Sequence, residues 1–132
     1  MKFIISESQK NKIESSIYQF IDNLFPSKID YQFYDEEGNV SDDFGSYDSI
    51  DFVDEEWEGV FRIYFESYFK DSRNLKNKYK FPYIELGKEY LTKLDNYFGD
   101  KWHSVFQEWF DNKFPKLNLI KFGEFEKTKK KT

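Results

Sequence analysis

The stretch Gly-Val-Phe-Arg-Ile-Tyr-Phe-Glu-Ser-Tyr-Phe, residues 59–69, carries the strongest strand pattern in this sequence. Within it, Phe61, Ile63, Phe65 and Phe69 stand at odd-numbered positions. Side chains of a strand alternate between two faces, so apolar residues at every second position form one buried face. The pattern therefore predicts a strand over residues 59–69 whose other face is mixed in polarity.

The sequence before this stretch predicts one helix and further short strands. Residues 3–5 are apolar and predict a strand, and the Ser-x-x-Gln spacing that follows is typical of a capping box at the start of a helix. Apolar residues then recur at helical spacing until Pro26, which ends the helix. Alternating apolar residues predict strands at 29–34 and 50–53, separated by a polar loop.

The sequence after the central strand predicts two more helices. Residues 70–81 are basic and read as a surface connection, and Pro82 is expected in the first turn of a helix. That helix ends at Gly99, a common C-cap residue, and Asp100 is expected to cap a second helix with a wide aromatic face. Residues 117–122 predict a last short strand.

These elements predict a single α+β domain over residues 1–126, followed by a mobile basic tail over residues 127–132. The expected order is β-α-β-β-β-α-α-β. Because successive strands usually pair, we expect a small, mainly antiparallel sheet with about three helices covering one face. Hydrophobic residues make up 39% of the chain, which is enough for one core.

The amino-acid composition limits where the protein can be located and which kinds of metal or disulfide site it can contain. The 132-residue chain has no cysteine, which excludes disulfides and thiolate metal sites and favours an intracellular location. Its apolar opening is too short for a signal peptide. No stretch approaches the ~20 apolar residues that cross a bilayer, so no membrane partner is expected.

Negative charge is concentrated in one part of the chain. Between Lys28 and Arg62 there are twelve acidic residues and no basic one, whereas the whole chain has a formal net charge of −5. Removing these twelve charges from the total leaves +7 on the rest, much of it in residues 127–132. The chain is therefore electrically polar along its length.

The opening Ser6-Glu7-Ser8-Gln9, placed directly after apolar residues, resembles the start of many short proteins of tailed bacteriophages, which carry an [ST]-E-[SN]-Q sequence followed by a helix. A second stretch, residues 105–110, is similar to a late tryptophan-containing helix in some of them. The resemblance implies a viral origin and hence the cytoplasm of a bacterial host or a virion. It implies no function.

Catalytic and metal-binding signatures are weak. His103 is the single histidine, and no nucleophile or orienting acid stands at triad-like spacing, so it reads as a surface histidine beside Trp102. Oxygen-bearing residues alternate from Asp35 as in an EF-hand loop, but Val40 and Ser46 replace its glycine and its last glutamate. Scattered single glycines form no phosphate-binding loop. We therefore predict no cofactor and no metal.

The acidic segment suits a basic partner. Carboxylates steer the encounter with arginine and lysine, and partly exposed aromatic residues supply compact anchors. We predict a non-enzymatic interaction module that binds a basic protein surface, as an inhibitor or a mimic of nucleic acid. Tyr47, Phe52 and Trp57 are the expected anchors. The predicted partner-binding residues are Asp42, Asp43, Tyr47, Asp48, Asp51, Phe52, Asp54, Glu55, Glu56 and Trp57.

Three alternatives stay open. Opposite charges at residues 30–58 and 113–132 would let subunits of a virion or assembly protein pack head to tail as a homo-oligomer. Tyr79 and Phe81, among lysines, would offer stacking surfaces to nucleic acid, although the acidic segment disfavours phosphate. An enzyme of unknown type is the third.

Overall fold

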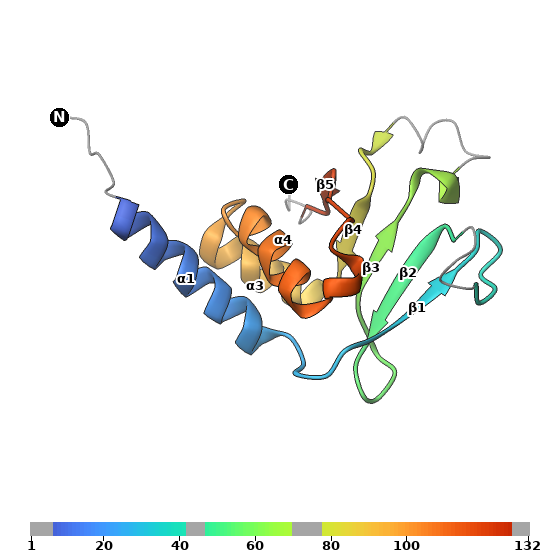
Figure 1. The fold of residues 1–132 in the computed structure, drawn as a ribbon, viewed down its shortest axis with the longest axis horizontal. Coiled ribbons are helices and arrows are strands. Elements are labelled where there is room, and N and C mark those ends of the chain that lie inside the picture. The colour runs from blue at the N-terminus through green and yellow to red at the C-terminus, as the bar shows by residue number, and fades with distance from the viewer. Residues whose placement is uncertain (1–6, 42–46, 70–77, 128–132) are drawn as a thin grey trace, which may run out of the picture.

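The computed structural model describes residues 7–41, 47–69 and 78–127 (Figure 1). The helices are α1 (Glu7–Leu24), α3 (Lys88–Phe98) and α4 (Trp102–Lys113). The strands are β1 (Asp30–Tyr34), β2 (Ser49–Val53), β3 (Gly59–Tyr64), β4 (Tyr83–Leu86) and β5 (Glu124–Phe125), and two short 3-10 helices are η1 (Glu66–Phe69) and η2 (Pro115–Leu117). This is the predicted class, a small α+β fold. The strand expected at 3–5 and the tail at 128–132 lie outside the described residues.

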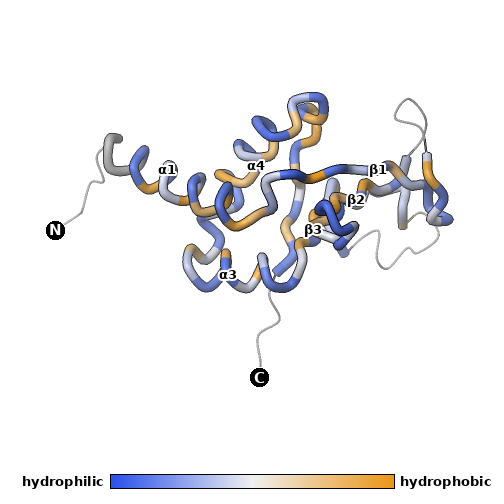
Figure 2. The backbone as a smooth tube through the Cα atoms, turned by 90° about the horizontal axis from the view of Figure 1, so that it is seen from below, coloured by the Kyte–Doolittle hydropathy of each residue, from blue (hydrophilic) through white to orange (hydrophobic). Residues whose placement is uncertain are grey.

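The five strands form one sheet in the order β1-β2-β3-β4-β5. The first four pair antiparallel with their neighbours, and β5 pairs parallel with β4. A register row of Phe33, Ile50, Ile63 and Ile84 crosses the sheet, and all four are buried. The helices gather on that side, as Figures 1 and 2 show. The opposite side, which we call the outer face, carries no α-helix of the described residues.

Aromatic side chains build the core between the helices and the inner face. Phe52 of β2 stacks on Phe61 of β3, with ring centroids 4.3 Å apart, and meets Phe110 of α4 edge-on at 5.7 Å. Phe25, just after α1, stacks on Trp109 of α4 at 5.1 Å. Offset and edge-to-face pairs of this kind add to the hydrophobic stabilisation of burial. The expected aromatic face of the second C-terminal helix is thus confirmed.

Two buried tryptophans tie the helices together through their indole N–H groups. Trp102 donates to the Asp95 carboxylate of α3 at 2.8 Å, and Trp109 donates to the Asp22 carboxylate of α1 at 3.0 Å. A buried indole N–H needs a hydrogen-bond partner, so each carboxylate removes a cost of burial and fixes a helix pair.

The central strand is shorter than predicted. It ends at Tyr64, and η1 follows where the prediction continued the strand to residue 69. The rings of Tyr64 and Tyr68 lie 4.9 Å apart, and those of Tyr64 and Phe69 lie 5.7 Å apart. The chain turns there because these three aromatic residues pack together, a tertiary contact that alternation alone does not reveal.

The segment around Pro82 was also predicted wrongly. It leads into strand β4 and not into a helix, so Leu86 is a strand residue and the helix begins at Lys88. The prediction that Asp100 caps the next helix is also wrong, because the residue before α4 is Lys101 and no side-chain cap is formed. Asp100 contributes only its backbone carbonyl, which accepts the His103 N–H at 3.3 Å. The segment predicted as a last strand begins at the last residue of η2 and is otherwise turn and irregular structure, and the strand lies later, at β5.

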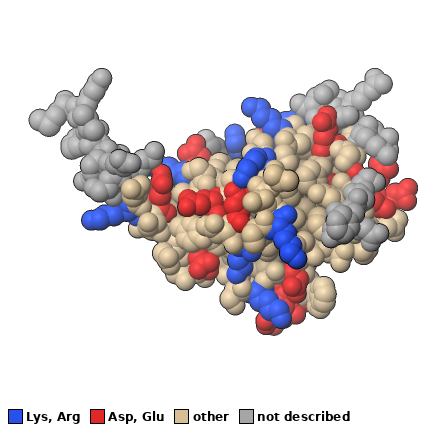
Figure 3. All heavy atoms as spheres, viewed as in Figure 1, with Lys and Arg blue, Asp and Glu red and all other residues tan. Residues whose placement is uncertain are grey.

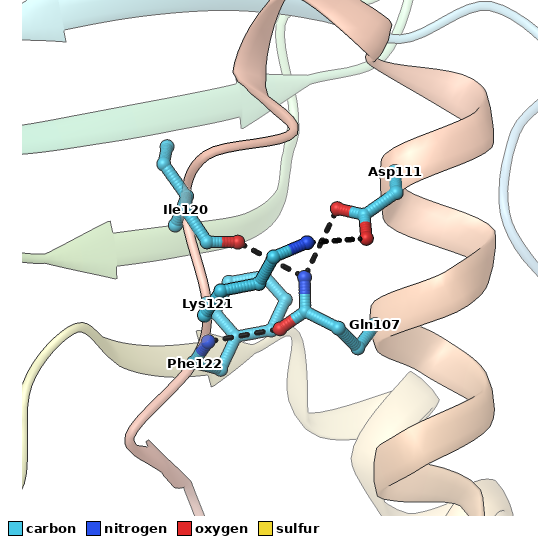
Figure 4. Close-up of polar contacts among 5 residues, drawn as sticks. All are labelled: Gln107, Asp111, Ile120, Lys121 and Phe122. Atoms are coloured by element: carbon cyan, nitrogen blue, oxygen red, sulfur yellow. Dashed lines mark hydrogen bonds and ion pairs between the residues drawn. The ribbon is translucent and has the colours of Figure 1, made fainter.

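A glutamine fixes the C-terminal segment onto α4 (Figure 4). The Gln107 amide accepts the Phe122 N–H at 2.9 Å and donates to the Ile120 carbonyl at 2.9 Å. Lys121 pairs with Asp111, one turn further along the helix, at 2.8 Å. These contacts satisfy backbone groups that have no strand partner and hold the chain in position for β5.

Candidate functional site

A row of charged side chains crosses the outer face of the sheet. Asp51, Arg62 and Glu85 are register neighbours on β2, β3 and β4. The Arg62 guanidinium donates to both oxygens of Asp51 and, at 3.4 Å, to the Tyr64 hydroxyl. Hydrogen bonding to Asp51 raises the pKa of Arg62 above its ordinary value, against the effect of partial burial. Arg62 is thus fixed in the sheet and neutralises Asp51.

A hollow of ≈340 Å³ opens on this face beside the charged row. We call it the outer-face hollow. Its walls include Asp51, Arg62, Tyr64 and Glu85 from the strands, and Trp57 from the loop between β2 and β3. Glu85 is exposed, and among the described residues no ion pair involves it. The hollow therefore combines aromatic walls with a carboxylate that has no ion-pair partner in the described part of the chain.

The loop between β2 and β3 is a tight turn built by one carboxylate. We call residues 54–58 the hairpin tip; it is the green loop at the bottom of Figure 1. The Asp54 carboxylate accepts the backbone N–H groups of Glu56 at 2.8 Å and Glu58 at 3.0 Å. The Trp57 N–H donates to the Asp54 carbonyl at 3.1 Å. This turn holds Trp57 in the left-handed region, at φ 64°.

The same turn occurs a second time, after β1. The Asp35 carboxylate accepts the N–H groups of Glu37 and Asn39, both at 2.9 Å, and the Gly38 N–H donates to the Asp35 carbonyl at 3.1 Å. Gly38 has φ 82° at the position that corresponds to Trp57. Glycine adopts this conformation freely, whereas a residue with a Cβ atom loses about 1–2 kcal/mol there. Trp57 therefore stands in a glycine position.

Trp57 is also the most unusual tryptophan by exposure. Its side chain is 78% exposed, whereas Trp102 and Trp109 are 0% and 1% exposed. Glu55, Glu56 and Glu58 on either side of it are exposed too. The hairpin tip thus presents a large indole surrounded by carboxylates.

The structure separates the predicted binding residues into three groups. Asp51, Asp54, Glu55, Glu56 and Trp57 come together at the hairpin tip and the neighbouring hollow. Asp42 and Asp43 lie outside the described residues. The remaining three are placed elsewhere.

The prediction that Phe52 is a partner-binding anchor is wrong, because its side chain is 0% exposed and packs in the aromatic core. It alternates with Asp51 and Val53 along β2, so it points to the inner face. Tyr47 and Asp48 precede β2 and lie at the end of that strand away from the hairpin tip. The Tyr47 ring packs on Phe33 at 4.5 Å, which leaves it as support for the sheet.

His103 packs between aromatic side chains. Its ring stacks on Phe125 of β5, with centroids 4.3 Å apart and planes 8° apart, and meets Trp102 edge-on at 4.4 Å. Burial lowers the pKa of His103, while the carboxylates of Asp95 and Asp100 act in the opposite direction. This arrangement holds β5 against α4.

The other candidate functions concern metal ions, nucleic acid and membranes. In the described ranges, no three histidine, aspartate or glutamate side chains form a group that could hold a metal ion. Tyr79 and Phe81 pack on Tyr83 and Phe69, at 4.5 and 5.6 Å, on the outer face. On the face shown in Figure 3, acidic and basic side chains are interspersed. No helix in the described part of the chain has the length and hydrophobicity to cross a membrane.

Comparison of the chain with protein-family models, curated proteins and solved structures gives no match. What the fold and the site define is thus a class: a small α+β protein with an exposed, acidic, tryptophan-bearing hairpin.

One sequence signal could have located this site. The tripeptide Asp-Glu-Glu occurs at residues 35–37 and again at 54–56, followed by glycine in the first case and tryptophan in the second. Aspartate followed by glycine three residues later is typical of such turns. The charged row across the sheet had no comparable signal, because it depends on the register of three strands.

Proposed function

We propose that this protein is a non-enzymatic interaction module whose hairpin tip binds a basic surface on another protein. The observation that carries the proposal is Trp57, exposed in a position where the equivalent turn has Gly38. The left-handed conformation of Trp57 and the exposure of its apolar surface to water both lower the stability of the free protein. Such strain is common where a side chain serves a binding function.

The chemistry of the hairpin tip supports a basic protein partner. Tryptophan is among the residues that contribute most to binding when a partner covers them. Four carboxylates, at Asp54, Glu55, Glu56 and Glu58, surround it within five residues. They would attract a positive surface and accelerate association. Where that surface normally binds nucleic acid, the protein would act as an inhibitor.

The electrostatic part of this proposal is tested by capture from a bacterial lysate with the immobilised protein, at low and at high salt. In the test variant, Glu55, Glu56 and Glu58 are changed to glutamine, while Asp54 is kept because it builds the turn. We expect the unchanged chain to capture a basic protein at low salt and to release it at high salt. The variant should fail to capture this protein at low salt.

A matched control removes three exposed carboxylates on the helical side, with Glu89→Gln, Asp100→Asn and Glu108→Gln. This control has the same net charge as the test variant and should capture the partner normally. Equal capture by both variants would show that net charge alone is involved and would refute the proposal. Capture unaffected in the test variant would refute it as well.

A further inference from the structure

Arg62 shows how the side chains of the outer-face hollow bind a guanidinium group. Its two-point pairing with Asp51 is combined with a position 5.7 Å from the centre of the Tyr64 ring. Arginine is suited to this combination because its planar group matches a carboxylate and also lies well against an aromatic face. One guanidinium site of the hollow is therefore already filled.

A second set of the same groups has no guanidinium partner among the described residues. Glu85 stands on the other side of Arg62 in the register row, and Trp57 lines the same hollow with its indole exposed. We propose that the outer-face hollow receives an arginine side chain of the partner, between Trp57 and Glu85. This inference rests on the proposed function, since it names the residue type that the hairpin tip and the hollow together recognise.

Charge and size favour this occupant. The hollow and the hairpin tip together carry six carboxylates, on Asp51, Asp54, Glu55, Glu56, Glu58 and Glu85, and one guanidinium, on Arg62, which gives a formal charge of −5. A volume of ≈340 Å³ is at the small end of ligand pockets and holds one long side chain. Lysine would satisfy the charge but lacks the planar group that matches both a carboxylate and an indole.

The test compares two probe peptides of equal charge, hexa-arginine and hexa-lysine, binding to the full chain. Affinity is followed by the change in tryptophan emission on titration, which reports on Trp57 because the other two tryptophans are buried and out of reach of a peptide. Backbone amide shifts measured by NMR then locate the contact. We expect hexa-arginine to bind about fivefold more tightly, with shifts at Tyr64 and Glu85 as well as at the hairpin tip.

Two variants separate the inference from the proposed function. Glu85→Gln should abolish the preference for arginine, whereas Glu108→Gln on α4 should preserve it. Equal affinity for both peptides, or a preference that survives Glu85→Gln, would overturn the arginine site; salt-sensitive shifts at residues 55–58 would then still support the proposed function. A chain that binds neither peptide at low salt would contradict both. Tighter binding of a single-stranded oligonucleotide than of either peptide would also overturn them.

Discussion

Trp57 and Gly38 occupy equivalent positions in two turns that have the same hydrogen-bond pattern. Comparison of the two turns therefore shows the effect of one side chain on the backbone. Both turns use an aspartate carboxylate that accepts two backbone N–H groups. Both place the fourth residue at positive φ. The glycine turn therefore serves as an internal reference for the strain at Trp57.

Replacing Trp57 with glycine should stabilise the protein. Relief of the left-handed strain should raise the free energy of unfolding by about 1–2 kcal/mol. The greater freedom of glycine in the unfolded chain should lower it again by about 0.4–1 kcal/mol. We expect the free energy of unfolding in urea to rise by about 0.5–1 kcal/mol. Gly38→Ala, in the reference turn, should lower it by a similar amount. A Trp57→Gly variant that is clearly less stable would show that the indole has a structural role.

Phe52 gives the opposite kind of residue, one that belongs to the core although it stands in the acidic segment. Phe52→Ala should lower the free energy of unfolding by about 3–5 kcal/mol, because it leaves a cavity among stacked rings. Leu119→Ala, at a side chain that is 91% exposed, should change stability by less than about 0.5 kcal/mol. A mild effect of Phe52→Ala in urea unfolding would contradict its placement in the core.

At the scale of elements, sequence patterns predicted the helices, which depend on local interactions, better than the strands, which depend on pairing with distant segments. The helices α3 and α4 were predicted because their apolar residues repeat every turn and Gly99 separates them. Strand β4 was missed because four residues show a single alternation, and its pairing with β3 comes from a segment about twenty residues away. The outer-face hollow depends on that pairing, so Glu85 could not be assigned to it from sequence.

The contact between Gln107 and the C-terminal segment is an element-scale feature with a direct test. Gln107→Ala leaves the Phe122 N–H without its acceptor, which should cost about 1–3 kcal/mol of unfolding free energy. Hydrogen exchange at Phe122 and Glu126 should accelerate as β5 loosens. Gln19→Ala, on the exposed side of α1, serves as the control and should leave both quantities unchanged. Unaltered exchange in the Gln107 variant would show that β5 is held by other contacts.

The stack of His103 on Phe125 makes the same region sensitive to pH. Burial lowers the pKa of His103 in the folded protein below the ordinary 6.5 of the unfolded chain. The neutral ring therefore contributes stability that is fully present above pH 6.5 and is lost as the pH falls below it. His103→Phe keeps an aromatic ring and removes the titration. We expect the unchanged protein to lose more unfolding free energy than this variant between pH 7.5 and pH 5; parallel losses would contradict the assignment.

At the scale of the whole molecule, charge segregation along the chain does not translate simply into surface patches. Asp51 is neutralised by Arg62, and Asp35 and Asp54 build turns. On the face shown in Figure 3, acidic and basic groups are interspersed. Among the described residues, the acidic segment thus forms two turns, at Asp35 and at Asp54, and only the second, the hairpin tip, carries an exposed tryptophan and adjoins the outer-face hollow. The sequence located this segment but could not separate its structural carboxylates from its exposed ones.

We propose that Trp57 serves binding at the expense of the stability of the free protein. The most direct test of this proposal is capture from a bacterial lysate by the Trp57→Gly variant, compared with the unchanged chain at the same low salt. We predict that the variant, although at least as stable, captures the partner at least about tenfold less well. Undiminished capture by Trp57→Gly would contradict this proposal, because the exposed indole would then have no role in recognition.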